Sequence, residues 1–372
     1  GQYSVSNIRD LLTDIQDNMN QASALANPKE FGLQYSVNFN QDHKVQFRAL
    51  QNPQVSISNQ SSYLAGFVES RNMNVINHSN NKVALVLKCK NTIGESCFWD
   101  PRDNQLWWTD IEEKKIWSLN EDGHSKIFNL PDRAGFILPR KEPGFIIGFP
   151  KNISIANQDL TSFTTIQEVE TDITQTRIND AKIDPYGGVV FGTFDETSDR
   201  NKRRPIGSVY RLSPNGLLTK LFNQVTVSNG IAFSPNGKTM YFTDTPNDIV
   251  RKFQIDHNFN SYKELDIFIN KNTAPGFPDG GTCDSHGNYW SARVRGGCVV
   301  CYNDKGQLIS KISTPSQTPT CLAFGGRDLK TLYITSLSSK NHSLNKVDDI
   351  ESGNVFSLNV ETPGLMQSLA IL

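Results

Sequence analysis

The sequence has no long hydrophobic run. None of its apolar stretches approaches the roughly 18 residues that a membrane-spanning helix requires. Its first residues, GQYSVSNIRD, lack the charged-then-apolar order of a signal peptide. We therefore expect no membrane partner and a cytoplasmic location, whereas a leader removed from the chain would place the protein in the periplasm or outside the cell.

The sequence also lacks an excess of positive charge and a dense set of cysteines. Its formal net charge is −1 over 372 residues, which argues against a nucleic-acid partner. Six cysteines are too few for a disulfide framework, and we expect them to be reduced. Cys298 and Cys301 form a C-x-x-C pair, but in a predicted strand residues three apart point to opposite faces. This arrangement argues against a metal or redox role for the pair.

Beyond residue 85 the sequence shows little of the 3.6-residue periodicity that marks helices. Instead, a turn motif followed by an apolar strand recurs six times. The copies begin at Trp99, Lys141, Ile183, Phe233, Cys283 and Phe324. Their starts lie about 41 to 50 residues apart, a period typical of β-propeller blades. The repeat therefore predicts an all-β fold with six blades.

The turns of the repeat carry the residues that tight hairpins need. Pro-Asn-Gly, Ser-His-Gly and Pro-Tyr-Gly supply Gly and Asn for positive φ angles. Most copies contain a second hairpin, which completes a unit of four strands. The last copy supplies only three strands, so we expect the strand at residues 83–88 to pair with the C-terminal blade. That pairing would close the ring and remove two exposed sheet edges.

Residues 1–82 do not belong to the repeat. Their apolar spacing predicts an amphipathic helix over residues 4–26. The segments LQYSVNFN, KVQFRAL and PQVSISN alternate apolar and polar residues and predict short strands. The predicted architecture is a six-bladed β-propeller over residues 83–372 with a small N-terminal α+β extension over residues 1–82. We expect this extension to cover the mouth of the site or to mediate a homo-oligomer; the alternative is a partly ordered tail.

Polar residues near the start of each innermost strand are the candidates for chemistry, because these strands line the central channel of a propeller. We expect the inner strands to begin at Phe98, Lys182, Ile231 and Thr282. A few residues before each of these positions the sequence has polar residues. The candidates are Glu95, Arg177, Asn179, Asp180, Asn229 and Asp279. Similar positions in different blades would point toward the same axis.

Carboxylate and amide oxygens that converge in this way suit a hard divalent cation. Ca²⁺, Mg²⁺ and Mn²⁺ prefer oxygen ligands, and Zn²⁺ is the further candidate. Asn-Gly at Asn229 and Asp-Gly at Asp279 are also ordinary turn dipeptides. A turn does not explain why Glu95 takes the place of Asn or Asp in the first blade, so the three positions together favour a metal site.

Four motifs at these positions resemble those of the senescence-marker-protein, gluconolactonase and luciferin-regenerating-enzyme family, the regucalcin-like proteins. They read GES-x-x-W-D from Gly94, R-x-N-D-x-K-x-D-P from Arg177, SNG-x-A-x-SP-x-GK-x-x-Y-x-x-D from Ser228, and PDG-x-x-x-D-x-x-G-x-x-W from Pro278. The resemblance covers about residues 83–372. It implies a six-bladed propeller with one divalent metal ion in the channel.

The resemblance also implies an activity and roles for individual residues. The family's known enzymes mostly hydrolyse sugar lactones to aldonic acids, so the implied substrate is a small sugar lactone. By motif, Glu95, Asn229 and Asp279 would be the metal ligands, and Arg177 and Asn179 would bind the substrate. Asp279 would also be the general base. A metal-bound carboxylate is a weak base, but lactones are activated esters and need only modest help from a base.

Two departures from the family pattern affect the substrate side. Ala181 stands where the family usually has Gly, which predicts a slightly different course for the loop that carries Arg177. The acidic residue that shapes the sugar pocket falls in FDETSDRNKRR, where Asp195 and Glu196 both qualify; we take Glu196 as the substrate-binding candidate. The charged segment that follows predicts an exposed loop or, alternatively, a lid.

Other functional classes stay open. WWTDIEEKKIWSLNEDG resembles the protein-binding propellers of low-density-lipoprotein receptors, although their W-T-D pattern appears convincingly only once here. A regulatory propeller that binds Ca²⁺ without catalysis would have the same ligands. An esterase or phosphotriesterase-like hydrolase would use the same metal with a more apolar pocket.

Overall fold

The structure is a computed structural model that describes residues 35–39, 45–49, 82–338 and 349–372. The chain divides into two units, residues 1–73 and 74–372. In the first unit, β1 (Tyr35–Phe39) pairs antiparallel with β2 (Val45–Ala49). Two of the predicted N-terminal strands are thereby confirmed. The helix predicted over 4–26 and the strand predicted in PQVSISN lie outside the described residues, and the boundary at residue 82 stays a prediction.

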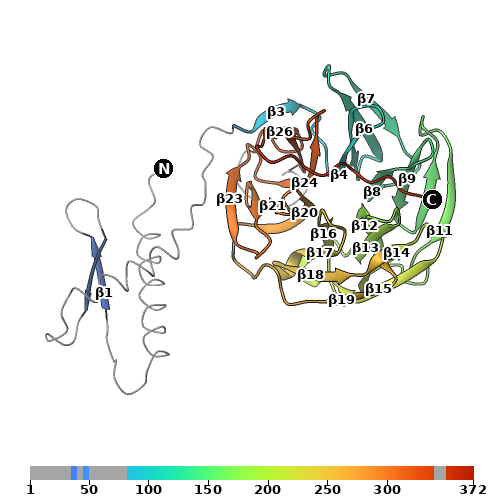
Figure 1. Cartoon of the computed structure of the whole chain (residues 1–372). Coiled ribbons are helices and arrows are strands. Elements are labelled where there is room, and N and C mark those ends of the chain that lie inside the picture. The colour runs from blue at the N-terminus through green and yellow to red at the C-terminus, as the bar shows by residue number, and fades with distance from the viewer. Residues whose placement is uncertain (1–34, 40–44, 50–81, 339–348) are drawn as a thin grey trace. The chain divides into compact units, whose positions relative to one another are not determined.

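The second unit is the predicted six-bladed β-propeller, and each blade is a four-stranded antiparallel sheet (Figure 1). Blade one contains β4 (Gly94–Asp100), β5 (Gln105–Asp110), β6 (Lys115–Asn120) and β7 (Ser125–Asn129). Blade two contains β8 (Phe136–Pro139), β9 (Phe145–Phe149), β10 (Asn152–Ala156) and β11 (Phe163–Glu168). Blade three contains β12 (Thr176–Ile183), β13 (Val189–Asp195), β14 (Gly207–Leu212) and β15 (Leu218–Val225).

The remaining blades follow the same order. Blade four contains β16 (Ser228–Phe233), β17 (Thr239–Asp244), β18 (Ile249–Ile255) and β19 (Tyr262–Glu264). Blade five contains β20 (Phe277–Cys283), β21 (Tyr289–Val294), β22 (Cys298–Tyr302) and β23 (Leu308–Ser313). Blade six contains β24 (Pro319–Gly325), β25 (Thr331–Ser336) and β26 (Val355–Asn359), with β3 (Ala84–Leu87) as its fourth strand.

The recurring turn motif has a clear local cause. In blade five the carboxylate of Asp284 accepts hydrogen bonds from the backbone N–H groups of His286 and Asn288, at 3.0 Å each, and from the Trp290 indole at 3.0 Å. Gly287 takes the positive φ of +84° that the turn requires. The Asp, Gly and Trp of the motif are therefore one hydrogen-bonded unit that reverses the chain between β20 and β21.

The ring closes as the sequence predicts. β3 comes from the N-terminal end of the propeller and pairs antiparallel with β26, with Leu85 opposite Phe356 and Leu87 opposite Val355. In Figure 1 the cyan strand β3 accordingly lies beside the red strand β26. This pairing joins the two ends of the propeller sequence in one sheet, so that neither end leaves an open edge.

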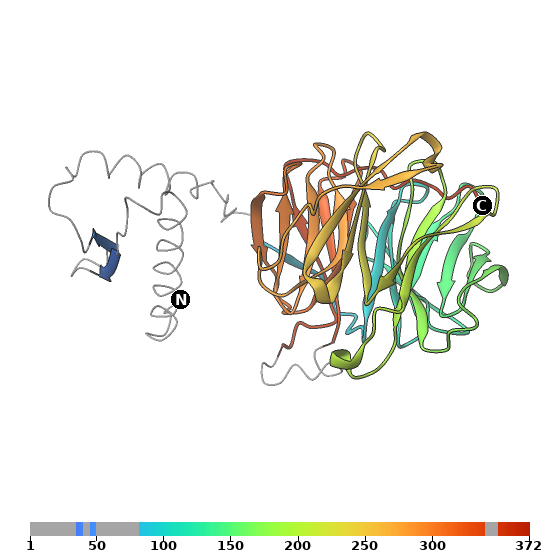
Figure 2. The ribbon, with the colours of Figure 1, turned by 90° about the horizontal axis from the view of Figure 1, so that it is seen from below.

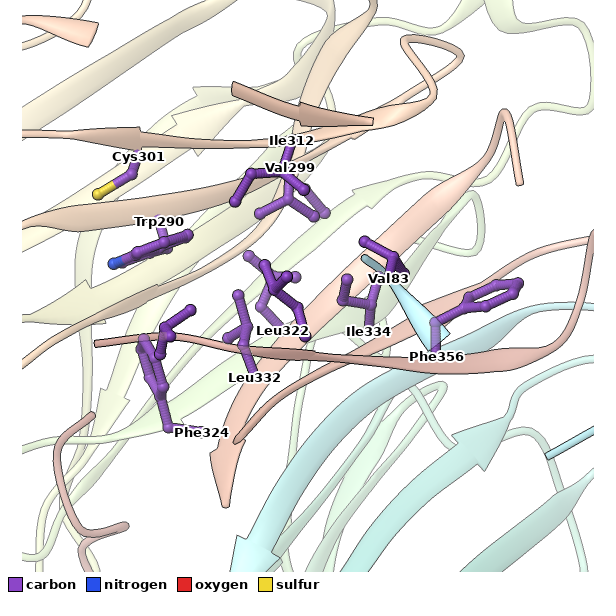
Figure 3. Close-up of a cluster of buried hydrophobic side chains, with 13 residues drawn as sticks. Val83, Trp290, Val299, Cys301, Ile312, Leu322, Phe324, Leu332, Ile334 and Phe356 are labelled. Carbon is purple, nitrogen blue, oxygen red and sulfur yellow. The ribbon is translucent and has the colours of Figure 1, made fainter. Parts of the chain in front are cut away.

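The hydrophobic core consists of six clusters of buried side chains, and each cluster lies between two neighbouring blades. Figure 3 shows the cluster between blades five and six, where Trp290 and Val299 face Leu322 and Phe324. Val83, just before β3, packs in the same cluster. The two faces of each sheet therefore pack against different neighbouring blades. Each blade depends on both neighbours to bury its apolar side chains.

The C-terminal segment crosses the face of the propeller that carries the turns between first and second strands. Its backbone hydrogen-bonds to the turn of blade five through Asp284 and Gly364, and to blades two and three through Pro139 and Gly187. Residues 365–368 lie against the C-terminal ends of β12, β16 and β20 around a cavity of about 70 Å³. The C terminus accordingly lies near one face in the edge-on view of Figure 2. This segment covers one end of the channel, and a site in the channel opens at the other.

None of the helices in the described part of the chain has the length and apolarity needed to cross a membrane. The helical elements there are three short 3₁₀ turns, η1 (Arg200–Lys202), η2 (Thr245–Asn247) and η3 (His257–Phe259). The Cys298–Cys301 segment is strand β22, as predicted, and both thiols are buried and free.

Candidate active site

The six first strands form a closed ring around the propeller axis, since each contacts the first strand of the next blade. Five of them, β4, β12, β16, β20 and β24, contain a β-bulge at the same place. At each bulge two residues oppose a single residue of the neighbouring strand. β-Bulges redirect side chains and are frequent beside functional sites.

The candidate residues lie inside these inner strands, at the bulges, and not in front of them as the sequence suggested. Glu95 and Asn229 occupy the same position, directly before the bulge, where they pair with Thr109 and Thr243. Asp279 is one position later, as the first of the two bulged residues. The prediction that the three residues occupy equivalent positions is wrong for Asp279, which lies one residue further along its strand than Glu95 and Asn229 do.

Gly230 in the SNG motif permits the close approach of blades four and five. It adopts a φ of +62°, and a Cβ atom there would lie 2.6 Å from the Tyr289 hydroxyl. That hydroxyl donates a hydrogen bond to the Gly230 carbonyl at 3.0 Å. Glycine at this position therefore lets the strand with Asn229 approach the strand with Asp279.

A chain of hydrogen bonds links the candidate residues of three blades. The Asn179 amide donates to Asn229 Oδ1 at 3.1 Å, and the Asn229 amide donates to Thr245 Oγ1 at 2.8 Å. Thr245 in turn donates to the carbonyl of Pro278 at 2.9 Å, directly before Asp279. This chain fixes the orientation of the Asn229 side chain and ties it to the backbone that carries Asp279.

Three carboxylates share the buried space near the axis. Burial raises the pKa of Asp279 to about 8, and the charge of Asp180 adds to the rise. Burial likewise raises the pKa of Asp180 to about 6, against the charge of Lys182. The pKa of Glu95 lies well above its usual range because of burial and the charges of Asp279, Cys321 and Asp180. The raised pKa values mean that the negative charges of these carboxylates repel one another and are not balanced by nearby positive charge.

The donor set fits a hard divalent cation rather than a soft one. Glu95 and Asp279 supply carboxylate oxygens and Asn229 an amide oxygen, the ligand types of Ca²⁺, Mg²⁺ and Mn²⁺. Within the described ranges, no three or more His, Cys, Asp or Glu residues are grouped so that they could hold a metal by themselves. A cation held by Glu95, Asn229 and Asp279 would therefore depend on the Asn229 oxygen and on water.

The predicted substrate-binding residues Arg177 and Asn179 lie on β12, which forms the blade-three wall of the channel. Arg177 donates to Asn179 Oδ1 at 3.1 Å and to the Ile178 carbonyl at 2.9 Å, and its Nε has no hydrogen-bond partner among the described residues. Burial lowers the pKa of Arg177 to about 10, while Glu196 acts in the opposite direction. Ala181 directly follows the bulge and pairs with Phe191, so β12 continues there as a regular strand.

Asp195 and Glu196 have different surroundings. Asp195 is fully buried and accepts hydrogen bonds from Thr197 and Arg204. Burial acts to raise the pKa of Asp195, but these bonds outweigh it and bring the pKa to about 2. Glu196 instead pairs with the Arg133 guanidinium, at the mouth. The geometry favours Glu196 as the pocket residue and makes Asp195 the anchor of the loop that follows β13.

Sequence reasoning missed the arginines around this wall. Arg133 comes from the loop before β8, and Arg203 from the charged loop at residues 196–206. That loop is not simply exposed, since Arg200 and Arg203 are half-buried while Asn201, Lys202 and Arg204 are exposed. No pattern in a loop of mixed charges distinguishes the inward side chains from the outward ones.

The chain is similar to known proteins over most of its propeller. The family profile described as "SMP-30/Gluconolactonase/LRE-like region" matches residues 93–338. A 6-deoxy-6-sulfogluconolactonase of Pseudomonas putida is 32% identical over 292 residues, which are 78% of this chain and 99% of that protein. An L-arabinolactonase of Azospirillum brasilense is 30% identical over 293 residues, 77% of this chain and 95% of that one.

A solved structure has the same architecture. The calcium-binding protein regucalcin of Agrobacterium tumefaciens superposes with a TM-score of 0.71 at 26% identity, covering 78% of this chain and 98% of that one. The profile match spans the inner strands of all six blades and therefore every candidate residue of the site. The chain belongs to the SMP-30/gluconolactonase/LRE-like family.

Proposed function

We propose that this protein is a metal-dependent hydrolase that opens a sugar lactone to the aldonic acid. The observation that carries the proposal is the convergence of Glu95, Asn229 and Asp279 at the bulges, with Arg177 and Asn179 beside them. Curated relatives named as lactonases of gluconate- and arabinose-type sugars support the substrate class. The calcium-binding description of the regucalcin neighbour supports a divalent ion.

Each group has a role in such a reaction. Bound by Glu95, Asn229 and Asp279, a divalent cation would supply Lewis-acid polarisation of the lactone carbonyl and a lowered pKa for nearby water. Asp279 is the general base and takes a proton from the attacking water. The water oxygen bonds to the carbonyl carbon, the ring C–O bond breaks, and the ring oxygen leaves as a hydroxyl group after protonation.

The substrate side is polar and oriented. Arg177 is held by Asn179 and by its own strand, so its guanidinium group is oriented to donate hydrogen bonds to a sugar oxygen. Glu196, which pairs with Arg133, is our candidate to accept hydrogen bonds from sugar hydroxyl groups. Such a lining favours a polyol lactone over the apolar esters that a phosphotriesterase-like enzyme would take.

The test is hydrolysis of a panel of aldonolactones, followed as proton release. We expect turnover to fall at least about 100-fold when the metal is stripped and to return when Ca²⁺, Mg²⁺, Mn²⁺ or Zn²⁺ is added. Binding of Ca²⁺ without turnover of any lactone would contradict the proposal and favour a regulatory propeller. Turnover of apolar esters alone would favour the esterase alternative.

Thr245 tests the proposed metal site without touching a ligand. In Thr245→Val the Asn229 amide loses its hydrogen-bond partner and the link to Pro278 is lost. We expect the Kd for Ca²⁺, measured by calorimetric titration, to rise about tenfold, the size of effect typical of residues that orient metal ligands. The control is Thr239→Val at the far end of the same hairpin. An unchanged Kd in Thr245→Val would argue against Asn229 as a ligand.

A further inference from the structure

Arginines gather at the open end of the channel. Within a blade the strands alternate in direction, so the start of the inner strand lies on the same face as the turn between the second and third strands. This face carries Arg177 at the start of β12, Arg200 and Arg203 in the β13–β14 loop, Arg295 in the β21–β22 turn, and Arg133 before β8. The arginines therefore surround the place where substrate must enter.

Two of these arginines share one aromatic ring. The guanidinium carbons of Arg177 and Arg203 lie 4.5 and 4.9 Å from the centre of the Phe194 ring. Arg203 Nε donates to the Thr197 carbonyl at 3.0 Å, and Arg177 Nη1 donates to the Ile178 carbonyl. These contacts orient both guanidinium groups without neutralising either charge.

The carboxylates near the mouth are bound to other arginines. Glu196 pairs with Arg133, and Glu112 lies 3.6 Å from the same guanidinium. Asp195 pairs with Arg204 at 3.1 Å. Across the described part of the chain, neither Arg177 nor Arg203 has a carboxylate oxygen within ion-pair distance. Arg177 and Arg203 therefore both lie against Phe194 without a direct ion pair, and the charges of Asp195 and Glu196 reach them only from a longer distance.

The electrostatics agree with this geometry. Burial lowers the pKa of Arg200 to about 10, and the charges of Arg295 and Arg203 lower it further. Burial also lowers the pKa of Arg177; Glu196 and Glu112 act against this change, while Arg133 and Arg203 add to it. Like charges in partly buried positions cost free energy unless an anion joins them. An anion that joined these arginines would therefore be stabilised by more than one guanidinium group.

We propose that the substrate is an anionic sugar lactone, with a sulfonate or phosphate group that binds between Arg177 and Arg203. This inference rests on the proposed lactonase function and specifies its substrate class. The planar guanidinium group forms paired hydrogen bonds with tetrahedral oxyanions, which makes arginine the preferred residue for such groups. Arg200 also lies close enough to Asp279 to lower the pKa of that carboxyl group.

The experiment compares neutral and anionic lactones with the full chain and its variants. The substrates are glucono-lactone, its 6-phosphate and its 6-deoxy-6-sulfonate. The variants are Arg203→Gln and, as the matched control, Lys202→Gln, which removes the same charge from an exposed side chain of the same loop. A second readout is competitive inhibition by 6-phosphogluconate relative to gluconate, which does not require turnover of a charged lactone.

We expect the wild-type protein to prefer an anionic lactone. In Arg203→Gln, kcat/KM for that lactone should fall about 10- to 100-fold, with less than about a threefold change for the neutral lactone. Lys202→Gln should leave both unchanged. A preference for the phosphate or for the sulfonate tells which oxyanion the site accepts.

Two results would overturn the inference while leaving the lactonase function intact. One is an equal or higher kcat/KM for the neutral lactone, with gluconate inhibiting as well as its 6-phosphate. The other is an equal loss for both lactones in Arg203→Gln, which would mean that Arg203 only supports the loop. Absence of turnover with every lactone would instead refute the proposed function, and the inference with it.

Discussion

Replacement of Asp279 by asparagine is expected to lower kcat/KM for lactone hydrolysis by about a thousandfold. The variant keeps the shape of the side chain but loses a negatively charged ligand and the proposed general base at once. Asp279 is 7% exposed and lies at the bulge of β20, where no neighbouring side chain on the same strand could take its place. The measurement is the initial rate of proton release at saturating metal, together with the Kd for Ca²⁺.

The melting temperature of the Asp279→Asn variant distinguishes a functional role of Asp279 from a structural one. Because Glu95, Asp180 and Asp279 repel one another in a buried space, a neutral amide should not lower the melting temperature of the metal-free protein. The control is Asp122→Asn in the exposed β6–β7 turn, which should change neither activity nor stability. Activity within tenfold of wild type in Asp279→Asn would refute its assignment as ligand and base.

Truncation of Phe356 is expected to give the largest loss of stability. Phe356 is fully buried in the cluster between blades five and six, where it packs with Leu332, Ile334 and Val83 (Figure 3). Phe356→Ala should lower the free energy of unfolding by about 3 to 5 kcal/mol, the usual cost of removing a buried phenyl ring. Urea unfolding followed by tryptophan fluorescence measures the change.

The strand partner of Phe356 supplies the matched control. Leu85 lies directly opposite in β3 but is 42% exposed. Leu85→Ala should therefore cost less than about 1 kcal/mol, because little apolar surface leaves the protein interior. If the two variants were equally destabilised, the pairing of β3 with β26 and not the side-chain packing would govern the stability of the closing blade.

The repeat could be predicted because its causes are local. Asp284, Gly287 and Trp290 lie within seven residues of one another and form one turn, so their spacing in the sequence reports the structure directly. The closing strand could be predicted too, because the last repeat is one strand short. The same locality explains how the sequence could single out Glu95, Asn229 and Asp279 as candidates, because each stands at a similar place in its own repeat.

The offset of Asp279 could not be predicted. It depends on the bulge, and a bulge is defined by the residues of two paired strands, here β20 and β21. The choice between Asp195 and Glu196 has the same character. It depends on Arg204 and Arg133, which come from a loop and from another blade. The residues adjacent to Asp195 and Glu196 in the sequence carry no information on these ion-pair partners.

The sequence by itself therefore determined the six blades and the strand that closes them, since turn chemistry and strand alternation act over short distances. Only the tertiary structure decided which side chains meet across blades. It brought Arg203 of a mixed-charge loop beside Arg177 on the ring of Phe194. The direction of a loop side chain is set by its contacts with distant segments, and these exist only once the ring has closed.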